Sequence, residues 1–211
     1  MRNSLFNTLA IFFLIFTACN SNTGNSGKEN PVNNMDKDTS RSAPVTDDKD
    51  VKVVGVTYTN LDAMAAVSIK EIVSHYLHIK NALANDNGSE AGRGGKAMEG
   101  AIMKLDKSLL TSEQRKVYDE VGEDLQEHAE HIGKNGDNIK HQREHFLMMS
   151  EDMYGLVKAF GSGQALYHDH CPMYNKDKGG AMWLSETKEV KNPYYGSKMP
   201  KCGTVEEMIK Q

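Results

Sequence analysis

The chain has 211 residues, of which 26% are charged and 38% hydrophobic, and its formal net charge is −4 at pH 7. This length suits one domain of ordinary size together with a terminal extension. The slightly acidic balance provides no basic surface for a polyanion, so the composition argues against nucleic-acid binding.

The first residues have the pattern of a bacterial export signal. Arg2 supplies the positive end, residues 9–16 form an apolar run, and the small residues Thr17 and Ala18 precede Cys19. The run is shorter than the about 20 apolar residues of a membrane-spanning helix. A cysteine directly after small residues resembles a lipoprotein box, so we expect cleavage before Cys19 and its lipidation, including palmitate. An ordinary secretory signal that happens to contain a cysteine is the alternative.

Asn, Ser, Thr, Asp, Lys and Gly dominate the chain from Asn20 to about Asp50. Such a stretch cannot bury enough apolar surface to offset the entropy of ordering it, and we expect a flexible tether. We therefore predict a signal peptide over residues 1–18, a tether over 19–57 and one folded domain over 58–211. The lipid anchor would place this domain in the cell envelope, on the periplasmic side of the outer membrane.

Four stretches have the spacing of apolar side chains that predicts amphipathic helices. They run from Leu61 to about Ala84, from about Ser89 to Leu105, from Thr111 or Ser112 to about Ile132, and from about Asp137 to Phe160. Four glycines argue against the second helix, because each costs about 1 kcal/mol relative to alanine inside a helix; they are Gly92, Gly94, Gly95 and Gly100. The short turns predict a mainly α fold, an up-and-down bundle of three to four helices.

The segment from residue 164 to 211 has a different character, because prolines and glycines divide it into turns and short extended pieces. Its large apolar and aromatic side chains would otherwise form an exposed patch. We expect an irregular C-terminal tail with short strands, packed on the bundle.

Two short pieces of this tail carry soft metal ligands. Cys171 and Met173 flank a proline, and Met199 precedes Cys202 by three residues. A residue before proline is extended, so the sulfur atoms of Cys171 and Met173 should project from one side. By the same alternation His170 should point away, which makes it a weaker candidate. Thiolate and thioether sulfur favour a soft ion such as Cu(I), with Ag(I) as a further candidate.

All eight histidines occur in close pairs, namely His75/His78, His128/His131, His141/His145 and His168/His170. Spacings of three or four on a helix put both rings on one face, where they can hold one metal ion. His145 is the favoured ligand, because it shares a ridge with Met149 and Met153. The alternative is that polar helix faces simply carry histidines and that the methionines fill gaps in the core.

A disulfide is the other use for the two tail cysteines, since bridges persist in exported proteins. A bond between Cys171 and Cys202 would close a loop of about 32 residues and contribute on the order of 3 kcal/mol. One thiol cannot serve both purposes, and the residues leave the two alternatives open. The sequence has no di-iron, haem-attachment, zincin, phosphate-loop or nucleophile-elbow motif. We therefore expect no enzymatic activity.

Several tail motifs follow one another in a fixed order: Cys171-Pro172-Met173, Trp183-Leu184-Ser185, Asn192-Pro193-Tyr194-Tyr195-Gly196, Met199 and Cys202-Gly203. In this order, and with the preceding Gln142-Arg143-Glu144-His145-Phe146, they resemble a family of uncharacterised domains in Gram-negative bacterial lipoproteins. Similar domains occur at the C-terminus of the periplasmic adaptor subunits of copper/silver efflux pumps. The resemblance covers about residues 61–209, with a departure at Tyr174, where a small residue is expected.

Membership of this family would imply a mostly helical domain that binds or senses heavy metal. The residues carried over by position are His145, Cys171, Met173, Met199 and Cys202. We therefore expect a lipid-anchored protein that binds Cu(I), or Ag(I), at these residues, with His170 and Met149 as further candidates. Its role would be buffering, sensing or hand-over to an efflux or envelope partner. The alternative is a disulfide-stapled interaction module of the cell envelope that binds no metal.

Overall fold

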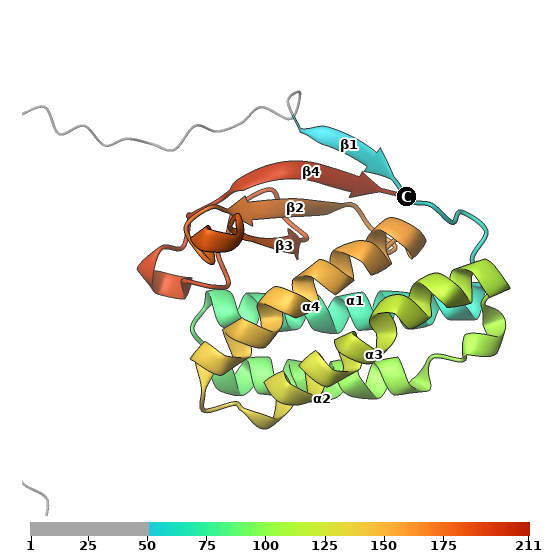
Figure 1. Ribbon diagram of the computed structural model, residues 1–211, viewed down its shortest axis with the longest axis horizontal. Coiled ribbons are helices and arrows are strands. Elements are labelled where there is room, and N and C mark those ends of the chain that lie inside the picture. Colours follow the sequence, from blue (N-terminus) through green and yellow to red (C-terminus); the bar gives the residue numbers. More distant parts are fainter. Residues whose placement is uncertain (1–50) are drawn as a thin grey trace, which may run out of the picture. The chain divides into compact units, whose positions relative to one another are not determined.

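The computed structural model describes residues 51–211 (Figure 1). The predicted signal peptide and Cys19 lie outside the described residues, as does most of the predicted tether. The described part begins with strand β1 (Lys52–Gly55), which lies inside the range 19–57 that we assigned to the tether. Within residues 51–211, no helix combines the length and the apolar composition needed to cross a membrane.

Four long helices form the larger part of the domain: α1 (Ala63–Ala84), α2 (Gly88–Lys104), α3 (Ser112–Lys134) and α4 (Ile139–Phe160). Consecutive helices run up and down beside one another (Figure 1). Side-chain caps define their starts. The carboxylate of Asp62 accepts the backbone N–H groups of Met64 and Ala65 at the start of α1. The predicted mainly α fold is confirmed, with the tail packed on the helices.

The tail is more regular than predicted, because its strands form one sheet. The strands β2 (Leu166–Cys171), β3 (Ala181–Ser185) and β4 (Thr204–Lys210) join β1 in the order β1-β4-β2-β3. Strand β2 is antiparallel to both of its neighbours, whereas β1 pairs in parallel with β4. The sheet lies along one side of the helices, with β3 against α1 and α4 (Figure 1).

The core lies between the helices and β3. Tyr76 of α1 stacks on Phe146 of α4, with ring centroids 5.1 Å apart, and both side chains are fully buried. The Tyr76 hydroxyl interacts with Ser150 and accepts the backbone N–H of Leu184 in β3. A buried hydroxyl with two partners avoids the cost of an unsatisfied polar group, so this contact ties both helices to the sheet.

The glycines of α2 allow two helices to approach closely, which explains why α2 forms despite them. A Cβ atom on Gly95 would lie 2.6 Å from the backbone nitrogen of Gly133 in α3. Gly94 likewise has no room for one, because the Ile79 side chain of α1 lies 2.8 Å from that position. Gly100 is different, since nothing lies within 4 Å of its Cβ position. The packing with α1 and α3 thus offsets the low helix propensity of this segment.

Gly95→Ala and Gly100→Ala form a matched pair. We expect Gly95→Ala to lower the free energy of unfolding by about 1 to 3 kcal/mol, because the added methyl meets the backbone of α3. Gly100→Ala should raise it by up to about 1 kcal/mol, because alanine has the higher helix propensity and the space is open. Urea unfolding followed by circular dichroism measures both, and equal effects of the two substitutions would contradict the close approach.

Candidate metal centres

The two cysteines of the tail lie in contact. Cys171 is the last residue of β2 and is fully buried, while Cys202 lies just before β4 and is half-buried. Their Sγ atoms are 2.7 Å apart, and both thiols are free. Two segments thirty positions apart in the sequence therefore bring their sulfur atoms together, as a shared site requires.

Local contacts explain why the Cys202 segment returns to β2. The buried side chain of Asn192 donates to the carbonyl oxygen of Cys202 at 2.6 Å, and its backbone N–H donates to that of Pro200 at 2.9 Å. Gly203 follows with a φ of +143°, and a Cβ there would lie 2.8 Å from the Trp183 ring. A glycine meets both demands, since it tolerates positive φ and has no side chain.

The distance between the thiols lies between those of two chemical states. A disulfide has an S–S bond of about 2.05 Å. Two thiolates, each about 2.3 Å from one d¹⁰ ion, lie about 3.5 to 4.5 Å apart. Burial, followed by the neighbouring Cys171, raises the pKa of Cys202 to about 11. Cys202 is therefore protonated at neutral pH, and metal binding or oxidation would have to remove that proton.

The two predicted methionine ligands, Met173 and Met199, lie near the two cysteines, and their known contacts there are made by backbone atoms. Cys171 is extended, as predicted, but the chain turns from Pro172 onward, so Met173 does not continue the strand. The side chain of Met173 is 52% exposed, and its carbonyl oxygen accepts the Tyr195 hydroxyl at 3.0 Å. The carbonyl oxygen of Met199 accepts the Cys202 N–H at 3.1 Å. Both residues thus lie in the turns that surround the thiols.

His170 and Met149, the two further candidates, have other contacts. The Nδ1 atom of His170 lies 3.0 Å from Glu206, and its Nε2 atom lies 2.9 Å from the carbonyl oxygen of Gly179. Both ring nitrogens therefore already have partners. Met149 is fully buried in the hydrophobic core together with Met153, which is the gap-filling role considered as its alternative.

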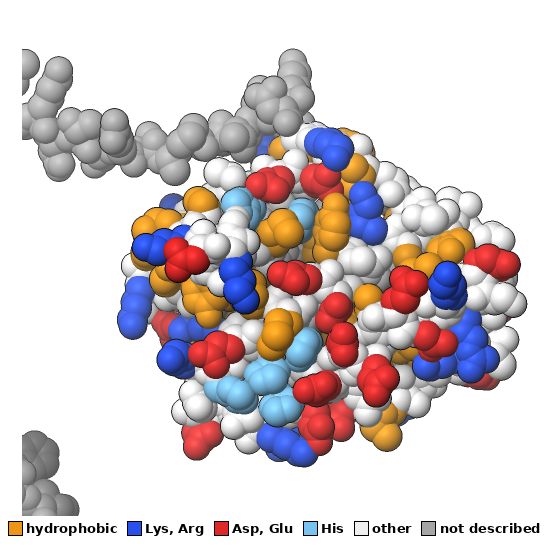
Figure 2. Space-filling model, viewed as in Figure 1, with side chains coloured by type: hydrophobic (Ala, Val, Ile, Leu, Met, Phe, Trp, Pro, Cys, Tyr) orange, Lys and Arg blue, Asp and Glu red, His pale blue; other side chains and the backbone are white. Residues whose placement is uncertain are grey.

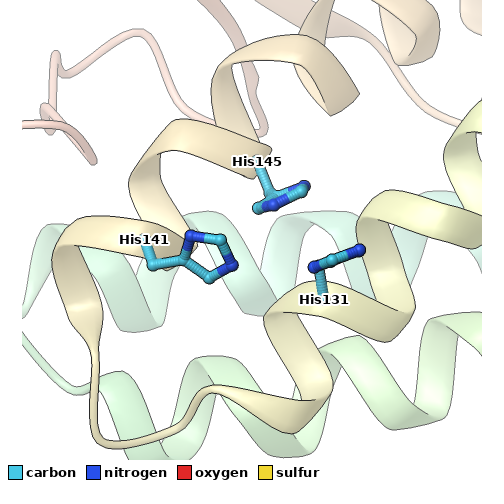
Figure 3. Close-up of side chains that lie close together, drawn as sticks. All are labelled: His131, His141 and His145. Atoms are coloured by element: carbon cyan, nitrogen blue, oxygen red, sulfur yellow. The ribbon is translucent and has the colours of Figure 1, made fainter.

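His145 lies among other histidines. His131 of α3 and His141 and His145 of α4 each place a ring nitrogen so that all three nitrogens lie within 4.8 Å of one another (Figure 3). The rings of His131 and His145 stack with centroids 4.2 Å apart, and His141 meets His145 edge-on at 4.5 Å. A fourth ring belongs to His128, whose Nδ1 atom is 3.2 Å from that of His145. We call these four residues the histidine cluster.

The turn between α3 and α4 brings the two histidine pairs face to face. It spans residues 135–138, so the end of one helix lies beside the start of the next. The side chain of Asn138 caps α4, and that of Asn135 donates to the carbonyl oxygen of His131. The buried Gln142 side chain donates to carbonyl oxygens of Ile132 and Gly88, which holds α4 against α3 and the start of α2.

Burial favours the neutral form of two rings in the histidine cluster, those of His145 and His128. Burial, followed by the neighbouring His131, His141 and His128, lowers the pKa of His145 to about 4. Burial also lowers the pKa of His128, although Glu127 and Asp124 act in the opposite direction. Neutral imidazole is the form that binds metal. Acidic side chains lie around the group of histidines on the molecular surface (Figure 2).

Sequence reasoning identified the two histidine pairs but not the histidine cluster as a unit. The periodicity of a helix shows which of its residues share a face, but not which face of the next helix that side meets. The available signal was the combination of spacings three and four on consecutive helices joined by a short turn.

The fold and the two groups of ligands describe a helical domain with a small sheet and two candidate metal centres. A family model described as a protein of unknown function (DUF3347) matches residues 72–165, from α1 to the end of α4 and slightly beyond. The match is consistent with the resemblance to a domain of unknown function. It stops before the two cysteines. No curated protein and no solved structure matches the chain.

The strand that leads to Cys171 also buries an acid. Asp169 is fully buried, and this burial raises its pKa to about 8, outweighing the opposite effect of Lys80. Between about pH 4 and 8 the folded protein therefore holds a proton that the unfolded chain, with a carboxyl pKa of about 3.9, has lost. The contribution of Asp169 to stability is consequently present at low pH and decreases as pH rises towards 8.

Asp169→Asn tests this, because the amide stays neutral at every pH. The free energy of unfolding of the variant minus that of the parent should increase by about 3 to 4 kcal/mol between pH 5 and pH 8. Urea unfolding at the two pH values gives the difference. Asp177→Asn is the control, since Asp177 is exposed, and a pH-independent difference for Asp169→Asn would contradict the raised pKa.

Proposed function

We propose that this protein is a lipid-anchored protein of the cell envelope that binds a soft metal ion, Cu(I) or Ag(I), for buffering, sensing or hand-over to an efflux partner. The observation that carries the proposal is the contact between Cys171 and Cys202, whose Sγ atoms lie 2.7 Å apart. Thiolate sulfur is the ligand type that favours soft ions over Mg²⁺ or Ca²⁺. The anchor would be the lipid on Cys19.

The reduced pair has the features that such a site needs. Its sulfur atoms have to separate by about 1 to 2 Å to hold a common ion at thiolate bond lengths. Cys202 is half-buried, so an ion can reach the pair from solvent. Met173 approaches Cys202 through its backbone and has an exposed side chain, and Met199 is joined to Cys202 by a backbone hydrogen bond. Thioether ligands from these turns would complete the coordination, with a metal-donating or metal-accepting protein as partner.

A Cu(I) titration of the full chain under reducing conditions tests the proposal. Cys171→Ser combined with Cys202→Ser should weaken Cu(I) binding by about 100-fold or more, because both thiolate ligands are removed. A competing chromophoric Cu(I) chelator measures the affinity, and circular dichroism checks that the variant is folded. Met103→Leu is a control, since this exposed methionine lies on α2. Parent-like affinity in the double variant would rule out the sulfur site.

A second candidate function follows from the same contact. Two thiols held this close in an exported protein are placed for oxidation to a disulfide, and the protein would then be a stapled interaction module without metal. Aromatic side chains pack within the same tail, with Tyr174 stacked on Tyr194 at 4.5 Å. The staple would fix this part of the tail against β2.

Alkylation of the exported protein before reduction separates the two candidates. A disulfide predicts that neither Cys171 nor Cys202 is alkylated, that the mass is two hydrogens lower than that of the dithiol, and that reduction lowers the melting temperature. Serine at either position should lower the melting temperature as reduction does. Complete alkylation of both thiols in the native protein would exclude the stapled module.

A further inference from the structure

We propose that His131, His141 and His145 form a second metal site, separate from the sulfur pair, which takes a divalent transition-metal ion such as Zn(II), Cu(II) or Ni(II). Imidazole nitrogen suits these ions, whereas thiolate and thioether sulfur suit Cu(I). The proposal stands on the geometry of the histidine cluster and does not depend on the function proposed above.

The distances are close to those that one ion requires. Three imidazole nitrogens bound to Zn(II) at about 2.0 to 2.1 Å lie about 3.3 Å from one another in a tetrahedral site. The three nitrogens of the cluster already lie within 4.8 Å of one another. Side-chain rotations are sufficient to close the remaining gap, since the three rings point towards a common space between α3 and α4 (Figure 3).

The helices that carry the ligands are held in place without an ion. The capping and Gln142 hydrogen bonds fix the turn between α3 and α4, and confine the movement needed for binding to the side chains. His131 and His145 are stacked with an interplanar angle of 9°. Binding of an ion would replace this one ring contact with two metal–nitrogen bonds. A preorganised site of this kind loses little conformational entropy on binding.

His128 has a positioning role. Its Nδ1 atom lies 3.2 Å from that of His145, within hydrogen-bonding distance. Such a hydrogen bond would leave the Nε2 atom of His145 for an ion. A hydrogen bond to the second ring nitrogen is the usual way in which proteins orient a metal-ligating histidine. His128 therefore acts through His145 and is not counted among the three ligands.

Carboxylates around the cluster favour a doubly charged ion. Glu127 lies 3.9 Å from the Nε2 atom of His131, and Glu144 lies 3.7 Å from the Nδ1 atom of His141. Asp124 acts electrostatically on His128. Negative charge near a half-buried site raises the local concentration of cations and stabilises a divalent ion more than a monovalent one.

The test uses the full chain with both tail cysteines replaced by serine, so that the histidine cluster is examined alone. We expect this protein to bind one Zn(II) or Cu(II) against a competing chromophoric chelator. His131→Gln combined with His141→Gln should weaken binding by about 100-fold, and His128→Gln by about tenfold. Cu(II) electron paramagnetic resonance of the cysteine-free protein should show coupling to imidazole nitrogen, and this signal should disappear in the double glutamine variant.

The control pair is His75→Gln with His78→Gln on α1. These histidines are three residues apart, like His128 and His131, but their ring nitrogens lie near Glu71 and Glu90 instead of other histidines. The control should leave the affinity unchanged. Equal losses in the two pairs would mean nonspecific binding and would overturn the proposal, as would parent-like affinity without His131 and His141. Because the cysteines are absent, this result stands whether or not the sulfur pair binds Cu(I).

Discussion

The guanidinium of Arg143 joins the parts of the fold on which both candidate centres depend. It donates to the carbonyl oxygen of Leu83 at the end of α1, to the Asp86 carboxylate in the next turn, and to the carbonyl oxygen of Pro193 in the tail. Asp86 also accepts the backbone N–H of Ser197, and these two partners lower its pKa to about 2. Arg143 lies between His141 and His145 along α4, so one planar ion joins the helix that carries these two imidazoles to the tail that carries the thiols. A lysine has one compact charge and could not make this set of directed contacts.

The helices could be predicted from the sequence because the spacing of apolar residues along a helix shows which of its faces is buried. The four predicted spans agree closely with the structure. The sheet could not, since β1 pairs with a strand more than 150 residues later and nothing local in Lys52–Gly55 indicates that pairing. The glycines of α2 also depend on contacts that are distant in the sequence. Their propensity is a local property, whereas the reason for Gly95 lies in the backbone of α3.

The contacts of the candidate ligands could likewise be predicted only in part. The meeting of Cys171 and Cys202 was predicted from their chemistry and holds in the structure, as a contact of two sulfur atoms. His145 was predicted as a partner of those sulfur atoms, but its ring contacts within the described residues are with His128, His131 and His141. The structure thus groups sulfur with sulfur and imidazole with imidazole. Such a separation would let one domain distinguish ions by their hardness, since each group offers one class of donor atom.

The turn at residues 135–138 has a consequence for the order of folding and metal loading. In small zinc domains the ion closes a loop that is open in the unfolded chain, so the polypeptide collapses only when the ion arrives. Here the chain between His131 and His141 is already closed by two capped helices and a turn of four residues. Binding of an ion would therefore save little further loop-closure entropy between these two residues. If the proposed site binds an ion, the domain would therefore fold before the ion arrives and could exchange it without unfolding, as a metal reservoir does and a metal-dependent scaffold does not.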